Sequence, residues 1–363
     1  MTFLLVILFL AALGISALLC VIVRAAARAA HLVDRPDARK DHAIPVALGG
    51  GVAIFAAVSV IVAGAVAAVA VVRGGGALPW GAAVAARYAD GVFVKLPALL
   101  AFLGGGAVIL ALGFWDDIRK ARGAGMNPWL KLGIQGLAVL PLVWEGMSLS
   151  LFVDNRVFGA VVTIFWIVGI ANAFNLLDNM NGLSAGVALI AAGLFLAVAV
   201  QNGQWFIAGL LTVFAGAVAG FLPFNFPGAS LFLGDAGALF LGYFLASSIV
   251  LFTFYEAGRT VFSIALPLLV LAVPLFDTVS VVWIRLREGR PVFVGDRRHL
   301  SHRLVDLGFS RTVAVLVIYL LTFGAGAAAT LLPRLDDVGA IVVLLQAAGG
   351  LSIVWLLERR RPE

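Results

Sequence analysis

The chain alternates between long apolar runs and short polar segments. Apolar runs of roughly 18 to 25 residues recur from end to end, and a helix of that length crosses the roughly 30 Å hydrocarbon core of a bilayer. The runs are 3–23, 48–72, 98–115, 129–148, 157–174, 183–201, 205–222, 237–255, 261–284, 311–332 and 338–357. The pattern predicts an all-α polytopic membrane protein with about eleven transmembrane helices, forming a single integral-membrane domain over residues 1–363.

Composition supports this class. Hydrophobic residues make up 63% of the chain and charged residues only 12%, against about 25% charged in an average soluble domain. The first apolar run is too long for a signal peptide, and neither a basic region before it nor a clear cleavage site after it is present. The single cysteine, Cys20, lies in this run and excludes both a disulfide framework and a thiolate metal site.

The basic residues predict the orientation. With the N-terminus outside, 19 of the 25 Lys and Arg residues fall in cytoplasmic segments, as the positive-inside rule requires. We therefore expect the N-terminus outside and the C-terminus in the cytoplasm. The net charge of +6 then reflects topology and anionic lipid headgroups rather than nucleic acid, for which no motif is present.

On this topology every unusual polar cluster falls in a cytoplasmic loop. The clusters are "DRPDARKDHAIP", the Asp116-Asp117 pair, "NAFNLLDNMNG", "FNFPGASLFLGDAG" and "EGRPVFVGDRRHLSHR". Oxygen ligands without thiols select hard cations such as Mg²⁺ or Mn²⁺, and neighbouring Arg and Lys neutralise phosphate oxygens. The residues alone therefore indicate a metal-assisted phosphoryl transferase that acts at the cytoplasmic face of a membrane, where a lipid phosphate meets a soluble phosphate donor.

Each cluster also has a simpler explanation. The two adjacent aspartates could end a helix in solvent, Asp178 and Asp235 could cap helices, and the Arg-rich loop could serve only as an orientation signal. Asp277 is harder to explain this way, because a carboxylate inside an apolar run is costly and functional by default. The coincidence of five clusters on one face argues for a shared site.

The same residues carry a family resemblance over nearly the whole chain. The matching segments are "DRPDARKDHAIPVALGG", "GFWDDIRK", "NAFNLLDNMNGL", "FNFPGASLFLGDAGALFLG", "PLFDT" and "GDRRHLSHRL". Their order and spacing resemble the polyprenyl-phosphate N-acetylhexosamine-1-phosphate transferases, glycosyltransferase family four. The resemblance implies transfer of a sugar-1-phosphate from a UDP-N-acetylhexosamine to undecaprenyl phosphate with release of UMP, an active site open to the cytoplasm, and a requirement for Mg²⁺ or Mn²⁺.

The resemblance also implies roles for individual residues. Asp235 matches a metal ligand, and Asp116 and Asp117 match an essential pair, one of which is proposed to deprotonate the lipid phosphate while the other helps to hold the metal. The expected catalytic residues are Asp116, Asp117, Asp178 and Asp235, with Asp235, Asp116 and Asp117 at the metal. The expected substrate-binding residues are Lys40, His42, Asn175, Asn181, Asn225, Phe232, Arg297, His299, Ser301 and His302.

The chain departs from the family pattern in two motifs. The usual D-G-x-D-G reads "DNMNG" at 178–182, so that the second acid is the amide of Asn181. The usual H-x-H-H reads "HLSH" at 299–302, so that Ser301 replaces an imidazole. We expect an altered donor preference, and a homologue that has lost catalysis remains an alternative.

Two further alternatives stay open. "RKDHAIPVALGGG" and "HLSH" resemble the N-acetylglucosaminyl-1-phosphate branch, which begins lipopolysaccharide O-antigen, teichoic acid and other envelope glycans, rather than the phospho-N-acetylmuramoyl-pentapeptide transferases of peptidoglycan synthesis. UDP-GlcNAc is thus the first choice of donor. An ion-coupled transporter is the rival from another class, although such proteins often carry internal repeats and none is found here. The sequence is compatible with a homodimer but does not fix the oligomeric state.

Overall fold

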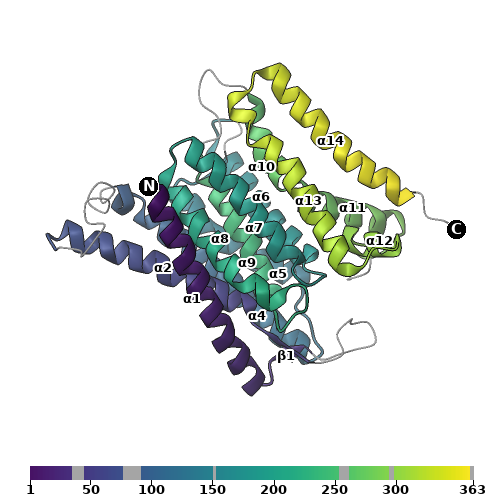
Figure 1. Cartoon of the computed structure of the whole chain (residues 1–363), viewed down its shortest axis with the longest axis horizontal. Helices are drawn as coiled ribbons and strands as arrows, with labels where there is room; N and C mark the ends of the chain where they lie inside the picture. Colours follow the sequence, from purple (N-terminus) through teal and green to yellow (C-terminus); the bar gives the residue numbers. More distant parts are fainter. Residues whose placement is uncertain (35–44, 77–90, 150–152, 253–260, 294–297, 360–363) are drawn as a thin grey trace.

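The computed structural model describes residues 1–34, 45–76, 91–149, 153–252, 261–293 and 298–359, and most of these residues are helical (Figure 1). The predicted helical class is confirmed. The elements up to the middle of the chain are α1 (Thr2–Ala29), β1 (Val33–Asp34), β2 (Val46–Leu48), α2 (Gly50–Arg73), α4 (Leu96–Ala121), α5 (Pro128–Trp144) and α6 (Arg156–Leu177). The later elements are α7 (Leu183–Gln201), α8 (Trp205–Asn225), β3 (Leu231–Phe232), α9 (Gly234–Val250), η1 (Val261–Ala265), α10 (Leu266–Val270), α11 (Ala272–Arg287), α12 (Leu300–Asp306), α13 (Arg311–Ala329), η2 (Leu332–Arg334) and α14 (Asp337–Arg359).

Each of the eleven predicted runs coincides with a helical segment, but the helices differ in length. Among the described residues, seven are long and apolar enough to cross a membrane, and an eighth crossing results if a bent helix pair counts as one span. The segments Pro128–Trp144, Gly234–Val250 and Asp337–Gly350 are apolar but shorter. The protein is a multi-pass membrane protein, whereas eleven crossings and the orientation stay predictions.

The bent pair consists of Val261–Val270 and Ala272–Arg287, which meet at 71°. Proline explains the break, because it lacks an amide hydrogen and its ring collides with the preceding turn. Pro267 is the second residue of α10, and Pro274 lies in the first turn of α11. Asp277 follows Pro274 by one turn and is 1% exposed, so the bend precedes the segment that carries this buried carboxylate.

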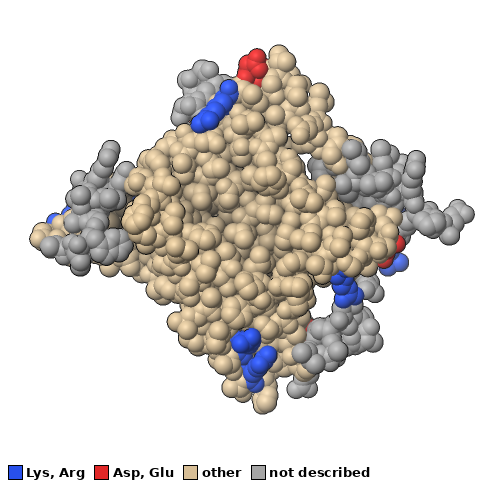
Figure 2. Space-filling model, viewed as in Figure 1, with Lys and Arg blue, Asp and Glu red and all other residues tan. Residues whose placement is uncertain are grey.

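Helix α9 forms the centre of the bundle. It packs against α2, α4, α6 and α7, and every residue from Ala236 to Ile249 is buried, as expected for a helix that is apolar on all sides. Phe244 stacks on Phe214 of α8 with ring centroids 4.2 Å apart. The outer helices expose large apolar side chains instead, and the face in Figure 2 is almost uncharged except near its margins, as a lipid-facing surface requires.

A small sheet, which the sequence did not predict, organises one end of the bundle. Its strand order is β1-β2-β3, with β1 and β2 antiparallel and β2 and β3 parallel. Strand β2 leads directly into α2, and β3 leads directly into α9. The amide of Gly51 donates to the carbonyl of Leu233 at 3.1 Å, which ties the two helix starts together.

Helix α9 approaches its neighbours through positions that have no room for a side chain. A Cβ atom added to Gly113 of α4 would lie 2.5 Å from the Cα of Ala236, and one added to Gly51 of α2 would lie 2.2 Å from the Cα of Gly237. Backbone atoms cannot move aside as a flexible side chain can. Gly113 therefore fixes how closely α4 and α9 approach at the end of the bundle that carries the sheet.

We expect Gly113→Ala to lower thermal stability and activity together. The added methyl group forces α4 away from α9, and overpacking of this kind costs about 1–3 kcal/mol. Gly104→Ala on the same helix is the matched control, because a Cβ there meets nothing within 4 Å and alanine favours the helix. Thermal unfolding of both variants in detergent tests this; equal melting temperatures for the two would contradict the close approach.

Candidate active site

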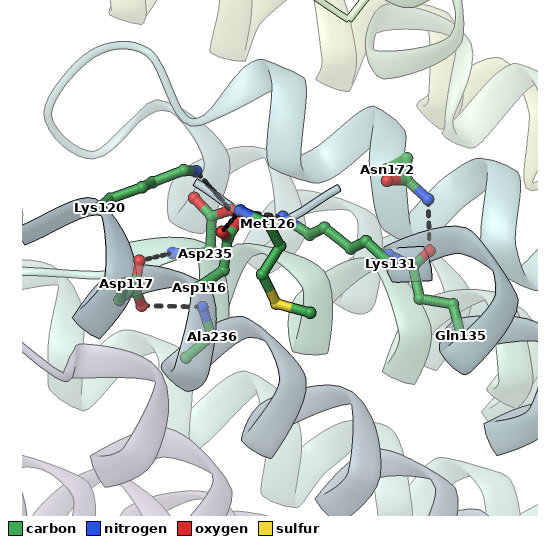
Figure 3. A network of polar contacts seen from close by, with 9 residues as sticks. All are labelled: Asp116, Asp117, Lys120, Met126, Lys131, Gln135, Asn172, Asp235 and Ala236. Carbon is green, nitrogen blue, oxygen red and sulfur yellow. Dashed lines mark hydrogen bonds and ion pairs between the residues drawn. The ribbon is translucent and has the colours of Figure 1, made fainter. Parts of the chain in front are cut away.

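The polar clusters meet where six helix ends gather. The C-terminal ends of α4, α6 and α8 and the N-terminal ends of α5, α7 and α9 carry the polar loops. These helices follow one another along the chain and pack in the pairs α4·α5, α4·α9, α6·α9 and α7·α8. The adjacent residues Asp116 and Asp117 lie beside Asp235, which is more than a hundred positions further along the chain, in Figure 3. Two of the five predicted segments thus meet here, whereas the segment of Lys40 and His42 lies outside the described residues.

A tight turn between α4 and α5 brings Lys131 back to Asp116. Helix α4 ends in a Schellman motif, in which Ala124 N donates to Arg119 O at 2.9 Å and Gly123 adopts a φ of +85°, a conformation that favours glycine. Asn127 is the N-cap of helix α5, and its side chain accepts hydrogen bonds from the amides of the first helical turn. Lys131 follows one turn later, on the site side of α5.

Two lysines bridge two carboxylates in this region (Figure 3). The Lys131 Nζ lies 2.9 Å from Asp116 Oδ2 and 2.5 Å from Asp235 Oδ2. The Lys120 Nζ lies 2.7 Å from Asp235 Oδ2 and 3.3 Å from Asp116 Oδ2. The Asp116 side chain is 4% exposed, and its other oxygen accepts from Met126 N at 2.9 Å. The Asp116 and Asp235 carboxylates therefore face a common point that holds positive charge.

Asp117 has a different environment from its neighbour. Its Oδ1 accepts from Asp235 N at 2.9 Å and its Oδ2 accepts from Ala236 N at 3.2 Å. These amides belong to the first turn of α9, whose N–H groups have no partner within the helix, so Asp117 caps α9 from α4. Gly234 adopts a φ of +74° where Asp117 reaches the helix start, and a Cβ there would lie 2.6 Å from Asp117 Oδ2. Asp117 thus sets the position of Asp235.

Asp178 completes a cluster of carboxylates at the C-terminal end of α6. Burial, and then the nearby carboxylates of Asp235 and Asp117, raise the pKa of Asp178 well above its ordinary value. Within the described part of the chain, neither Asp178 nor Asn175 makes a hydrogen bond or ion pair through its side chain. Both side chains are partly exposed and thus accessible to a ligand.

The loop after Asp178 is held by Asn225. The Asn225 Oδ1 accepts from Gly182 N at 2.7 Å, and its Nδ2 donates to Leu231 O at 3.1 Å. This side chain is 3% exposed, so Asn225 ties the loop to β3. Asn181 donates through Nδ2 to Pro227 O at 3.2 Å, which leaves its oxygen available to a ligand.

Asp277 orients His299 at the start of α12. The Asp277 Oδ2 lies 2.8 Å from His299 Nδ1, and its Oδ1 accepts from Leu300 N at 2.6 Å. An ionised carboxylate only accepts hydrogen bonds, so this contact places a proton on Nδ1 and leaves Nε2 as the other functional nitrogen. Both side chains are buried. Asp277 thus has a defined partner in His299. The sequence identified Asp277 only as an unusual acid in an apolar run.

The other predicted residues are placed only in part. Phe232 lies in β3 and His302 in the first turn of α12. Lys40, His42 and Arg297 lie outside the described residues, with Lys40 and His42 in the segment that connects β1 to β2 in the sequence. Lys120 and Lys131 were expected only as part of the orientation signal. The sequence signal for this role of Lys131 is its position at the start of a span, one short turn after the Asp116-Asp117 pair.

The donor set fits a hard cation. Among the residues that the structure describes, no three His, Cys, Asp or Glu side chains are grouped to hold a metal ion by themselves. Asp116 and Asp235, however, already share one ammonium group between two carboxylate oxygens. Mg²⁺ commonly takes one or two protein carboxylates and completes its shell with water and substrate phosphate. Asp117 fits less well as a ligand, because both its oxygens accept backbone amides.

Comparison with known proteins gives the family. The model of "Glycosyl transferase family 4" matches residues 99–253, which contain Asp116, Asp117, Asp178 and Asp235. A Bacillus subtilis protein named "Probable undecaprenyl-phosphate N-acetylglucosaminyl 1-phosphate transferase" is 32% identical over 80% of this chain and 74% of its own length. A Mycobacterium tuberculosis decaprenyl-phosphate N-acetylglucosaminephosphotransferase is 32% identical over 74% of this chain and 72% of its own length. A Limosilactobacillus fermentum phospho-N-acetylmuramoyl-pentapeptide-transferase is 33% identical over 60% and 68%. With the carboxylate cluster in place, the chain belongs to glycosyl transferase family 4 and is a sugar-phosphate transferase of the membrane.

Proposed function

We propose that this protein transfers N-acetylglucosamine-1-phosphate from UDP-GlcNAc to undecaprenyl phosphate or a related polyprenyl phosphate and releases UMP. The observation that carries this proposal is the pair of Asp116 and Asp235, held together around positive charge beside Asp178, whose side chain makes no hydrogen bond or ion pair with the described residues. The names of the B. subtilis and M. tuberculosis relatives support this acceptor class and sugar. The reaction begins an envelope glycan on the cytoplasmic leaflet of the plasma membrane.

In this proposal, Asp235 and Asp116 would hold a Mg²⁺ or Mn²⁺ ion. When bound there, such an ion would supply positive charge to the diphosphate of the donor, as divalent cations do in other phosphoryl transfers. With an ion between the two carboxylates, the ammonium groups of Lys131 and Lys120 would be free to contact phosphate oxygens of the substrates. Asp178 contributes an unpaired carboxylate to the same cluster, and His299 and His302 face the donor from α12.

The acceptor needs little help from a base. A phosphate monoester has a second pKa near 6, so at neutral pH much of it is already a dianion. One of its oxygens attacks the β-phosphorus of the UDP-sugar, the bond to UMP breaks, and the new diphosphate keeps the sugar. The site residues position the two phosphates and balance their charge. Deprotonation by Asp117 stays a prediction, since its geometry suits the cap of α9. A homodimer stays a prediction as well.

Product analysis tests the proposal. Purified protein with undecaprenyl phosphate, Mg²⁺ and either UDP-GlcNAc or the muramoyl-pentapeptide nucleotide is assayed for UMP and for a diphosphate-linked lipid. We expect both products from UDP-GlcNAc. Turnover with the muramoyl-pentapeptide nucleotide alone would assign the protein to the peptidoglycan branch. Ion flux in liposomes without nucleotide sugar, combined with no UMP release, would favour the transporter.

Metal removal gives a second expected outcome. Treatment with EDTA should abolish UMP release, because the donor diphosphate loses the divalent charge that the proposal places between Asp116 and Asp235, and added Mg²⁺ or Mn²⁺ should restore it. An unchanged elution volume on size exclusion shows that the protein stays intact. Full activity in EDTA, with metal-free substrates, would contradict a metal site at Asp116 and Asp235.

A further inference from the structure

Two of the polar segments are joined by a side-chain hydrogen bond. The hydroxyl of Ser301, in the first turn of α12, donates to Asn179 Oδ1, in the loop after α6. Ser301 is 1% exposed, so its hydroxyl is paired within the protein instead of facing a substrate. The amide of Asn179 is oriented independently, because its Nδ2 donates to Leu176 O at 3.0 Å. This orientation leaves Oδ1 as the end that meets Ser301.

The bond connects the two catalytic segments at their ends nearest the site. Asn179 follows the unpaired Asp178 directly, and Ser301 lies two residues after His299. The far end of the 178–182 loop is held at Gly182. Its carbonyl accepts a hydrogen bond from Tyr319 OH, and its amide donates one to Asn225 Oδ1. On the other segment, Asp277 holds His299. Between these two anchors, the Asn179–Ser301 hydrogen bond is a side-chain link that constrains the distance from Asp178 to His299.

Both partners occupy positions at which the chain departs from the family pattern. In the motifs that the resemblance implies, position 179 is the glycine of D-G-x-D-G and position 301 is a histidine of H-x-H-H, whereas this chain has Asn179 and Ser301. An imidazole is much larger than a hydroxyl and would not fit against the Asn179 amide at the present distance. A glycine at 179, in contrast, leaves room for an imidazole at 301. The two departures are complementary in size and in hydrogen bonding.

We propose that Asn179 and Ser301 act as one positioning pair, which holds the Asp178 loop against α12 and takes the place of a glycine–histidine pair. This inference rests on the proposed function for its kinetic consequence: Ser301 offers the donor diphosphate no imidazole, so that His299 and His302 are the imidazoles supplied by α12 and its N-cap. The pair contacts the catalytic segments but not the reacting atoms. Its effect should therefore appear in turnover more than in donor binding.

A double-mutant cycle tests the pair. Ser301→Ala and Asn179→Ala should each lower kcat by roughly five- to tenfold, as expected for one lost hydrogen bond, with KM for the UDP-sugar changed by less than about twofold. The double variant should be no worse than Asn179→Ala alone, because that variant has already lost the bond to Ser301 together with the one to Leu176 O. Ser59→Ala is the matched control, since the buried Ser59 hydroxyl has no hydrogen-bond partner within the described residues; it should retain full turnover.

The exchange of both residues gives a more demanding test. Ser301→His alone should be the most impaired variant, because the imidazole collides with Asn179. Asn179→Gly combined with Ser301→His should recover a large part of kcat. If Ser301→His does not fold, the cycle of Ser301→Ala and Asn179→Ala still tests the pair, because these substitutions only remove atoms.

The cycle is also followed by thermal unfolding without substrate, which requires no assumption about the reaction. Coupled shifts in melting temperature without any transferase activity would uphold the pair and reject the proposed function. Strictly additive effects in both kcat and melting temperature would overturn the pair, whatever the activity of the enzyme.

Discussion

Asp235→Asn should reduce kcat for UMP release by about two to three orders of magnitude, the loss found when a major charge-stabilising group is removed from an active site. Asp235 Oδ2 receives both Lys120 and Lys131, and a neutral amide cannot balance two ammonium groups. The lysines would then share Asp116 alone, and a divalent cation would lose one of its two carboxylates. The measurement is kcat at saturating UDP-GlcNAc and polyprenyl phosphate.

A matched control separates this effect from a general loss of charge. Asp154 is exposed and makes no hydrogen bond or ion pair within the described residues, so Asp154→Asn makes the same chemical change away from the site and should turn over normally. The apparent affinity for Mg²⁺ should fall in Asp235→Asn and not in the control. Wild-type kcat in Asp235→Asn would remove this residue from the mechanism.

Asp117→Asn should lower kcat by about a hundredfold and also lower the melting temperature. The two amides at the start of α9 need two acceptor oxygens, and asparagine supplies one oxygen and an NH₂ group that faces a donor. Loss of a helix cap costs about 0.5–2 kcal/mol, and the first turn of α9 then no longer holds Asp235 in place. Both quantities are measured on the same detergent-purified sample.

The combination of the two readouts distinguishes a cap from a base. A base that only accepts a proton would give a large loss of kcat with an unchanged melting temperature, and that outcome would assign Asp117 a chemical role. Asp116→Asn serves as the comparison, because Asp116 lies next to Asp117 in α4 but accepts from a lysine and from Met126 N instead of from α9. Normal kinetics together with normal stability in Asp117→Asn would contradict both roles.

The helical architecture could be predicted because lipid imposes a simple rule on sequence. A chain in hydrocarbon must satisfy its backbone hydrogen bonds within helices, so each apolar run could be assigned without knowledge of its partners. The meeting of Asp178 with Asp235 and Asp117 followed from the order of the loops. Run length alone does not fix the number of crossings, since α9 has only 17 residues and the ninth run is bent at Leu271.

Other features depend on long-range contacts that no local sequence pattern indicates. Lys131 looks like any basic residue at a helix end until the α4–α5 turn returns it to Asp116. Strands of two or three residues, such as β1 and β2, are too short for an alternating pattern. The Asn179–Ser301 bond joins residues 122 positions apart, and each of them taken alone resembles a neutral replacement.

The absence of a side chain at Gly113 has a consequence for how this enzyme type can diversify. Because main-chain atoms of α4 and α9 touch there, the acids just beyond the contact are carried by one stiff unit, and small mutations cannot retune their separation. Segments that are joined by exchangeable side chains, such as the 178–182 loop and α12, can be repositioned by substitution instead. Substitutions there can thus change turnover while the spacing of Asp116, Asp117 and Asp235 stays constant.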